Sequence, residues 1–401
     1  MPECPKEELP ITRNKNDEEE KLPVYIDFSH PRAKELLAAQ WKDRMDAGIR
    51  GSMVDFGDVV PDEAVFYDGR RGDEMHNAYA YQYAKNYREL FEQKYGDDHV
   101  LYTRGAAPGS QHFACQFGGD QLTSFQGLKY AIAGGLSAAA SGLPFWGVDA
   151  GGYDGFPDQE TYLRWTEYAA FCPLMRFHGT EPREPWEYDA FTVKVYRYYT
   201  WLRENLRPYI VSVAAEAHKL GIPMMRPLAM MYPEDQEATK VWDEYLFGED
   251  LLVAPVSDET EEREIYFPEG RWISLWNLND EISGPVQRSV EVPIDKIPVY
   301  IREGSFLPLR LNESLKLGES MSESETEMIL AVVPQNDSIV KETLYERSGA
   351  KTCCGMEKKW RNYTAPNFRK NSRALCNAGG NSLEKYRSYR KRKNINKSDC
   401  E

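Results

Sequence analysis

The stretch Gly51-Ser52-Met53-Val54-Asp55-Phe56-Gly57 decides the fold class of this chain. It reads as a short buried strand that stops at an acidic residue, and a glycine follows. Upstream, Pro31 opens a helical stretch that runs to about Ala47. The apolar positions of this stretch lie on one helical face: Leu36, Leu37, Trp41 and Met45. A helix followed by a buried strand is the repeating unit of an α/β fold.

The same alternation recurs downstream. After a first strand that ends near Phe28, further strands are predicted at 100–104, 113–117, 143–149 and 223–231, and helices at 74–95, 124–141, 159–172 and 187–219. Strands separated by helices indicate parallel βαβ units. No G-x-G-x-x-G follows a strand and no P-loop is present, so a (β/α)8 barrel is favoured over a doubly wound sheet. In such a barrel the active site lies at the carboxyl ends of the strands.

Composition excludes several classes of function. The formal net charge of −15 argues against nucleic acid as a partner, because phosphates need a basic face. The basic stretch 351–401 leaves two interpretations open, a solvated tail and a polyanion-binding tail. No apolar run approaches the roughly 20 residues of a membrane helix, and no secretory signal is visible, so we expect no membrane partner and a cytoplasmic location. The His residues show no H-E-x-x-H or paired spacing, so neither a metal nor a cofactor is expected.

Two acidic residues occupy comparable places in this pattern. Asp55 ends one predicted strand, and Asp120 follows another in Phe117-Gly118-Gly119-Asp120. Glycoside hydrolysis needs two carboxylates that flank one bond, and a retaining pair is expected to hold its carboxyl groups roughly 5–5.5 Å apart. An acidic residue at a strand end is also commonly a cap or a loop ligand, so position alone leaves both interpretations open.

The residues around these carboxylates narrow the choice. Met53–Asp58 and Phe117–Gln121 resemble the nucleophile and acid/base signatures of glycoside hydrolase family 31. Other segments resemble the family in the same order: Tyr25–Pro31, Tyr102–Arg104, Phe145–Tyr153, Met175–Gly179, Arg226–Leu228, Tyr245–Val256 and Ile297–Ser305. The resemblance covers about residues 24–310. It implies a glycoside hydrolase, an O-glycosyl bond hydrolase of the α-glucosidase or α-xylosidase type.

The resemblance implies a double displacement with retention of configuration. Asp55 would attack the anomeric carbon, and Asp120 would protonate the leaving oxygen and then deprotonate water. Arg104 and His178 resemble residues that bind sugar hydroxyls. The alternative for Arg104 is a structural ion pair, and the alternative for His178 is a histidine of the core. Asp149 is expected to contact the sugar or to support the site, and a structural role is the alternative.

Two aromatic residues and one substitution complete the expected site. Trp146 and Phe117 are candidate walls of the sugar pocket, with core packing as the alternative. Asp58 stands where most members of the family have Glu, and it is expected to orient the loop after Asp55. Phe56-Gly57 resembles the α-xylosidase and sulfoquinovosidase branches more than the α-glucosidase branch.

These features predict four segments. Residues 1–23 form a flexible polar lead, 24–236 a barrel catalytic domain that lacks its first strands, 237–311 a proximal C-terminal β-sandwich domain, and 312–401 a linker and a basic, disordered tail. The predicted fold is thus α/β. It is a partial (β/α)8 TIM barrel that contains the C-terminal strands of the barrel, and a small all-β C-terminal domain follows it.

The predicted function is a retaining exo-acting α-glycosidase that hydrolyses terminal α-linked glucosides or xylosides, with a small carbohydrate as substrate. The alternative is an inactive truncated fragment that acts at most as a carbohydrate-binding or interaction module. Hydrolysis of an aryl α-glucoside distinguishes the two. Sequence leaves the oligomeric state open, with a homo-oligomer as one option.

Overall fold

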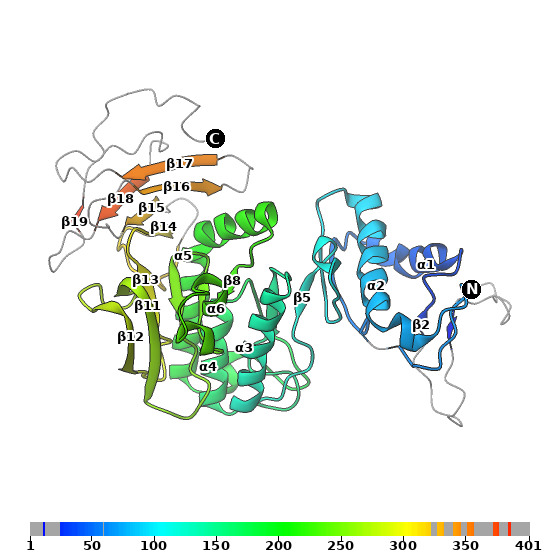
Figure 1. Ribbon diagram of the computed structural model, residues 1–401, viewed down its shortest axis with the longest axis horizontal. Helices are drawn as coiled ribbons and strands as arrows, with labels where there is room; N and C mark the ends of the chain where they lie inside the picture. The colour runs from blue at the N-terminus through cyan, green and yellow to red at the C-terminus, as the bar shows by residue number, and fades with distance from the viewer. Residues whose placement is uncertain are drawn as a thin grey trace. The chain divides into compact units, whose positions relative to one another are not determined.

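The computed structural model describes residues 11–12, 25–58 and 60–321, and five short strands beyond them, at 327–332, 340–345, 351–356, 372–376 and 384–385. The chain divides into two compact units. Unit 1 comprises residues 1–117 and 141–143, and unit 2 comprises 118–140 and 144–401. Figure 1 shows the elements, and each unit is described by itself.

Unit 1 contains the first predicted strands and helices. Its elements are β1 (Ile11–Thr12), β2 (Tyr25–Ile26), α1 (Ala33–Asp46), β3 (Gly51–Val54), α2 (Gly72–Tyr95), β4 (Val100–Thr103), η1 (Ser110–His112) and β5 (Cys115–Phe117). β3 pairs in parallel with β4, and β4 with β5. β2, which corresponds to the strand expected to end near Phe28, pairs antiparallel with β1 and is not part of the parallel sheet, so its prediction as a parallel strand is wrong. The rest of the predicted lead 1–23 lies outside the described residues. Parallel strands joined by helices confirm the predicted α/β class.

An aromatic stripe on α2 holds unit 1 together. Tyr79, Tyr83, Tyr87 and Phe91 recur every four residues, which places them on one helical face. Successive rings are in contact, with centroids 6.0 Å apart for Tyr79 and Tyr83 and 4.9 Å apart for Tyr83 and Tyr87. Phe91 is fully buried beside Leu101 of β4 and other apolar residues of the same core. The stripe thereby fixes the place of Tyr83, which reaches the end of β3.

Unit 2 begins with the second part of the parallel series. It contains α3 (Phe125–Ala140), β6 (Trp146–Asp149), α4 (Gln159–Ala170), β7 (Leu174–Arg176), η2 (Pro185–Glu187) and α5 (Ala190–Leu220), and β6 pairs in parallel with β7. Sequence patterns did not predict β7 as a strand, since it has only three residues and follows Pro173 directly. Asp149 and Arg176 are partners in the β6–β7 register, so the two strands end side by side.

A six-stranded antiparallel sheet follows in unit 2. It contains β8 (Met225–Pro227), β9 (Tyr245–Phe247), β10 (Leu251–Val253), β11 (Glu262–Ser274), β12 (Glu281–Glu291) and β13 (Val299–Arg302), in the order β12-β11-β13-β10-β9-β8. The short helices α6 (Leu228–Met231) and η3 (Ala238–Lys240) lie between β8 and β9 in sequence. The prediction that 223–231 is a last parallel strand is wrong, because β8 pairs antiparallel with β9. A short buried strand has the same apolar pattern whichever way its neighbour runs.

The C-terminal segment also contains strands. β14 (Phe306–Leu311) pairs with β15 (Glu327–Val332), and β15 pairs with β18 (Ser372–Cys376), which pairs with β19 (Glu384–Lys385). β16 (Val340–Tyr345) pairs with β17 (Lys351–Met356). The sequence predicts no fold for 312–401, whereas the structure assigns five strands there. Beyond 312–321 and these strands, the predicted linker and tail lie outside the described residues.

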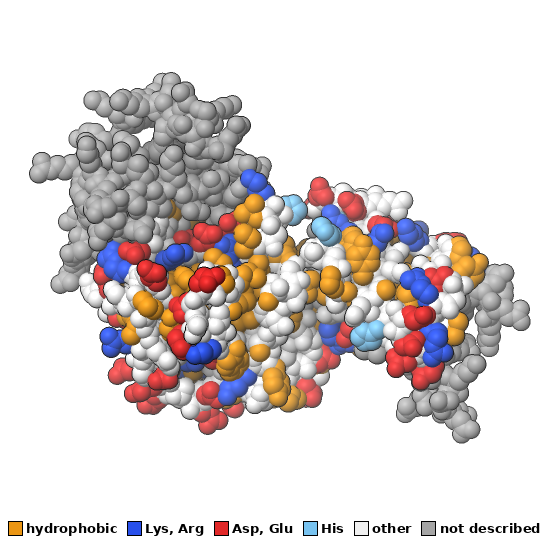
Figure 2. Space-filling model, viewed as in Figure 1, with side chains coloured by type: hydrophobic (Ala, Val, Ile, Leu, Met, Phe, Trp, Pro, Cys, Tyr) orange, Lys and Arg blue, Asp and Glu red, His pale blue; other side chains and the backbone are white. Residues whose placement is uncertain are grey.

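Two features of the structure concern the nucleic-acid and membrane partners discussed above. On the face drawn in Figure 2, basic side chains are interspersed with acidic ones and form no single patch. Within the described part of the chain, no helix is long and apolar enough to cross a membrane.

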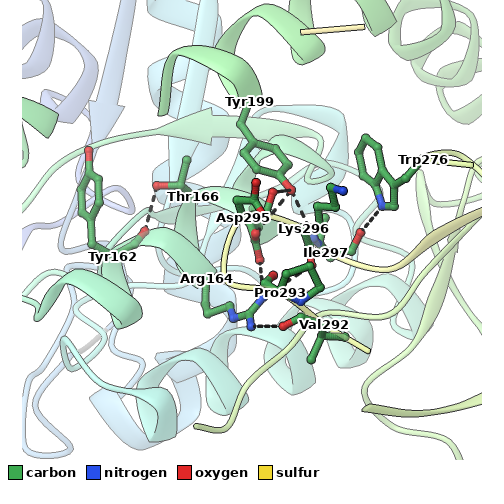
Figure 3. Close-up of polar contacts among 11 residues, drawn as sticks. Tyr162, Arg164, Thr166, Tyr199, Trp276, Val292, Pro293, Asp295, Lys296 and Ile297 are labelled. Carbon is green, nitrogen blue, oxygen red and sulfur yellow. Dashed lines mark hydrogen bonds and ion pairs between the residues drawn. The ribbon is translucent and has the colours of Figure 1, made fainter. Parts of the chain in front are cut away.

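A buried polar network joins α4 and α5 of unit 2 to the segment between β12 and β13 (Figure 3). Arg164 of α4 is 2 % exposed and donates to the carbonyls of Val292 at 2.7 Å and Pro293 at 3.2 Å. It also pairs with Glu167, one turn further along α4, at 3.1 Å. Tyr199 of α5 donates to Glu167 at 3.3 Å. Burial raises the pKa of Glu167, and the charge and hydrogen bond of Arg164 oppose this rise.

We expect Glu167→Ala to lower the free energy of unfolding by about 3–5 kcal/mol, because the guanidinium of Arg164 would remain buried without its carboxylate. Urea denaturation measures the loss. Glu204→Ala is the matched control, since Glu204 forms a similarly spaced but exposed pair with Arg207 and its removal should cost less than about 0.5 kcal/mol. Equal losses for both variants would contradict the assignment.

Candidate active site

Asp55 stands directly after β3, where its carboxylate is held from two sides. Its Oδ1 accepts a hydrogen bond from the backbone N–H of Phe56 at 2.8 Å and lies 3.5 Å from Nη1 of Arg104. The hydroxyl of Tyr83 donates to the carbonyl of Asp55. The side chain of Asp55 is 21 % exposed, so it is partly shielded yet reachable.

Arg104 links the ends of two neighbouring strands. It follows β4, and its guanidinium makes a bidentate contact with Asp58, with Nε 2.8 Å from Oδ2 and Nη2 3.2 Å from Oδ1. Bidentate pairing fixes the orientation of the guanidinium plane as well as its position. Asp58 thus holds Arg104 beside Asp55, and the two carboxylates share one cation.

The loop after β3 has a special backbone conformation. Phe56 has a φ of 62°, which is uncommon for a residue with a side chain, and the residue is 70 % exposed. The guanidinium carbon of Arg104 lies 5.0 Å from the centroid of this ring. A Cβ at Gly57 would overlap the ring of Tyr83, and one at Gly105 would lie 2.8 Å from the backbone of Asp58. Both glycines therefore allow close approaches around Asp55.

A second cluster lies in unit 2. Asp149 ends β6, is 1 % exposed and forms an ion pair with Arg176 of β7. Burial raises the pKa of Asp149, the charges of Arg176 and His178 oppose this, and the negative charge of Asp120 adds to it. These four residues are therefore electrostatic neighbours. The ion pair supports the structural role expected for Asp149.

Tyr153 connects the loops that bear Asp120 and His178. Its backbone N–H donates to the carbonyl of Gln121 at 2.7 Å, next to Asp120. Its ring lies 5.4 Å from that of His178. Asp120 and His178 are both exposed. The loops that follow β5, β6 and β7 therefore meet at Tyr153.

Arg183 ties two of these loops together and was missed by sequence reasoning. It is 6 % exposed and donates to the carbonyls of Gly152 at 2.9 Å, Tyr153 at 3.0 Å and Gly155 at 2.6 Å. A Cβ at Gly179 would overlap its guanidinium. Its partners are backbone carbonyls, which no sequence motif identifies.

The predicted aromatic walls lie among core residues. Trp146 packs on the glycines of α3, where a Cβ at Gly135 would lie 2.7 Å from its Nε1. Phe117 is 3 % exposed, and its ring lies 6.0 Å from that of Tyr102. These contacts account for both residues by packing, and their role as sugar-pocket walls stays a prediction.

The predicted site residues thus form two groups. Unit 1 brings Asp55 and Arg104 together, and unit 2 brings Asp120, Asp149 and His178 together. Within the described ranges, no three His, Cys, Asp or Glu side chains are placed to hold a metal ion.

Carboxylates on loops at the carboxyl ends of parallel strands are typical of barrel glycoside hydrolases. Residues 5–213 match the TIM-barrel domain of the glycosyl hydrolases of family 31, and residues 221–307 match the C-terminal domain of that family. The chain belongs to glycosyl hydrolase family 31, which confirms the predicted resemblance.

The chain is similar to several enzymes and solved structures. An isomaltosyltransferase of Sporosarcina globispora is 36% identical over 320 residues, 76% of this chain and 29% of the relative. An α-xylosidase of Emericella nidulans is 32% identical, over 71% of this chain and 38% of the relative. A cycloalternan-forming enzyme from Listeria monocytogenes, solved with a pentasaccharide substrate, has a TM-score of 0.82 at 28% identity, over 88% of this chain and 35% of that one. The chain spans about a third of the length of these relatives.

Proposed function

We propose that this chain bears the catalytic carboxylates of a retaining, exo-acting α-glycosidase that removes terminal α-linked glucose or xylose from small carbohydrates. The observation that carries the proposal is the setting of Asp55, held at the end of β3 by the N–H of Phe56 and by Arg104. A carboxylate that is oriented and partly shielded, yet reachable, suits attack on an anomeric carbon.

In the proposed first step Asp55 attacks the anomeric carbon and forms a glycosyl ester. Both contacts of its carboxylate fall on Oδ1, so the attack is assigned to Oδ2. Asp120 gives its proton to the leaving glycosidic oxygen in the same step. In the second step Asp120 takes a proton from water, which attacks the anomeric carbon and releases the sugar with its original configuration.

A second candidate function is glycosyl transfer. It is favoured by the 36% identity to an isomaltosyltransferase. The glycosyl ester is common to both reactions, because a sugar hydroxyl can replace water in the second step. The acceptor then decides between hydrolysis and transfer.

Incubation with α-glucosyl fluoride and α-xylosyl fluoride tests the proposal, with the products followed by proton NMR. Release of the α-anomer of glucose or xylose is expected, and initial release of the β-anomer would contradict retention. Addition of isomaltose as acceptor should yield a trisaccharide if transfer is favoured. Absence of turnover would favour the fragment interpretation.

We expect Arg104→Lys to lower kcat/KM by about 10–100-fold, because an ammonium cannot make the bidentate contact with Asp58 and face Asp55 at once. Steady-state kinetics on the glycosyl fluorides measure the effect. Arg88→Lys is the control, since Arg88 lies in the same unit and pairs with Glu92 on the surface of α2. A loss below about twofold for Arg104→Lys would remove Arg104 from the site.

A further inference from the structure

Aromatic residues with exposed surface occur on the segments of unit 2 that follow β6 and β7, where Trp186 precedes Tyr188 by two residues. Phe156 is 48 % exposed and Trp186 is 69 % exposed. The ring of Tyr188 stacks on that of Phe156, with centroids 5.2 Å apart and planes 21° apart. We call Phe156, Trp186 and Tyr188 the aromatic rim. Exposure of large apolar rings to water is unfavourable, so several exposed rings on neighbouring segments indicate a binding site.

The rim is built on a rigid base. The hydroxyl of Tyr188 donates to the carbonyl of Pro157 at 2.8 Å, and its ring stacks on Tyr162 of α4 at 4.8 Å. Asp189, the next residue, caps α5 by accepting from the N–H of Thr192 at 2.8 Å. Arg183 holds the carbonyl of Gly155, directly before Phe156. A platform fixed in this way binds with little loss of conformational entropy.

The rim is also continuous with the loop of the proposed acid/base. The hydroxyl of Thr123 donates to the carbonyl of Asp154 at 3.0 Å, and Leu122 forms an isolated bridge with Asp154. Leu122 and Thr123 follow Asp120 by two and three residues. A general acid stands on the side of the leaving group, because it protonates the leaving oxygen. The rim therefore lies on the leaving-group side, and Phe156 lies further along its loop than Tyr153, which contacts His178.

We propose that the aromatic rim binds a sugar unit of the leaving group that is separated from the cleaved bond, so that the preferred substrate is a neutral oligosaccharide. The apolar face of a pyranose stacks on an aromatic ring, and carboxylates accept its hydroxyls. Asp154 and Glu187 are exposed carboxylates next to the rim in sequence, and their charge disfavours an anionic ligand. This inference rests on the proposed function, because the leaving-group side is assigned from the proposed role of Asp120.

Calorimetric titration of the whole chain with isomaltotriose, maltotriose and glucose tests the rim. Wild-type protein should bind one of the trisaccharides more tightly than glucose. Phe156→Ala and Trp186→Ala should each weaken trisaccharide binding by about fivefold to tenfold, without changing glucose binding. Trp242→Ala is the matched control, since Trp242 is 50 % exposed in the same unit but precedes β9.

Three outcomes would overturn the proposal. They are equal binding of glucose and both trisaccharides by wild-type protein, unchanged trisaccharide binding by both rim variants, and equal weakening of glucose and trisaccharide. Turnover of the glycosyl fluorides, whose leaving group has no sugar, tests the proposed function separately. If the rim variants lose their preference for trisaccharide but still turn over the glycosyl fluorides, the binding role of the rim is supported. If trisaccharide binding depends on the rim but no fluoride is turned over, only the proposed hydrolysis is contradicted.

Discussion

Asp55→Ala should abolish turnover of every α-glycoside, whatever its leaving group. In the proposed mechanism the glycosyl ester forms on Asp55, so the variant loses the nucleophile of the first step. Removing a catalytic nucleophile typically lowers kcat by factors above about 10⁴. Initial rates of fluoride release from α-glucosyl and α-xylosyl fluoride measure the loss.

A surface carboxylate provides the matched control for this variant. Asp98 lies in the same unit, is 75 % exposed and pairs with Arg50. Asp98→Ala should keep wild-type rates within about twofold, as expected for a surface substitution. If Asp55→Ala retained more than a tenth of the wild-type rate, Asp55 would not be the nucleophile.

Asp120→Ala should discriminate between leaving groups. A sugar leaving group needs a proton, so its release should slow by about 10²–10⁴-fold. Fluoride and activated phenols leave without protonation, so their first step should be affected far less. The glycosyl ester then accumulates, because no base activates water, and added azide should restore the rate by attacking the ester.

The products separate the two roles. Azide that attacks the glycosyl ester gives an α-glycosyl azide, which the Asp120 variant should release. The Asp55 variant cannot form that ester and should not yield this product. An identical response of both variants to leaving group and azide would show that the roles are wrongly assigned.

Sequence predicted those parts of the fold whose pattern is long or periodic. The helices α1 to α5 were expected close to their observed bounds, because each presents an apolar face over several turns. β7 was missed because three residues have no measurable period. The direction of β8 was predicted wrongly because apolar content does not encode the strand's partner.

The site was predictable to a different degree. Asp55 and Arg104, expected at neighbouring strand ends, lie in contact, and Asp149 and His178 share one electrostatic cluster. Tyr83 could have been found, since the aromatic stripe of α2 repeats every four residues and points at the sheet. Arg183 could not, because its partners are main-chain carbonyls brought near it by two loops.

Arg164 also bears on how this chain could be divided. The two family matches meet between residues 213 and 221, which suggests a place to cut. Yet the guanidinium of Arg164 finds its carbonyl acceptors at Val292 and Pro293, and Ile297 and Val299 share one apolar core with Leu163 and Leu202. A shortened chain that stops at the boundary would leave the guanidinium of Arg164 without these two carbonyl acceptors and would expose apolar residues of that core. A chimera that takes this antiparallel sheet from a relative should therefore fold only when α4 and α5 come from the same relative. The two matched domains are accordingly expected to be inherited together.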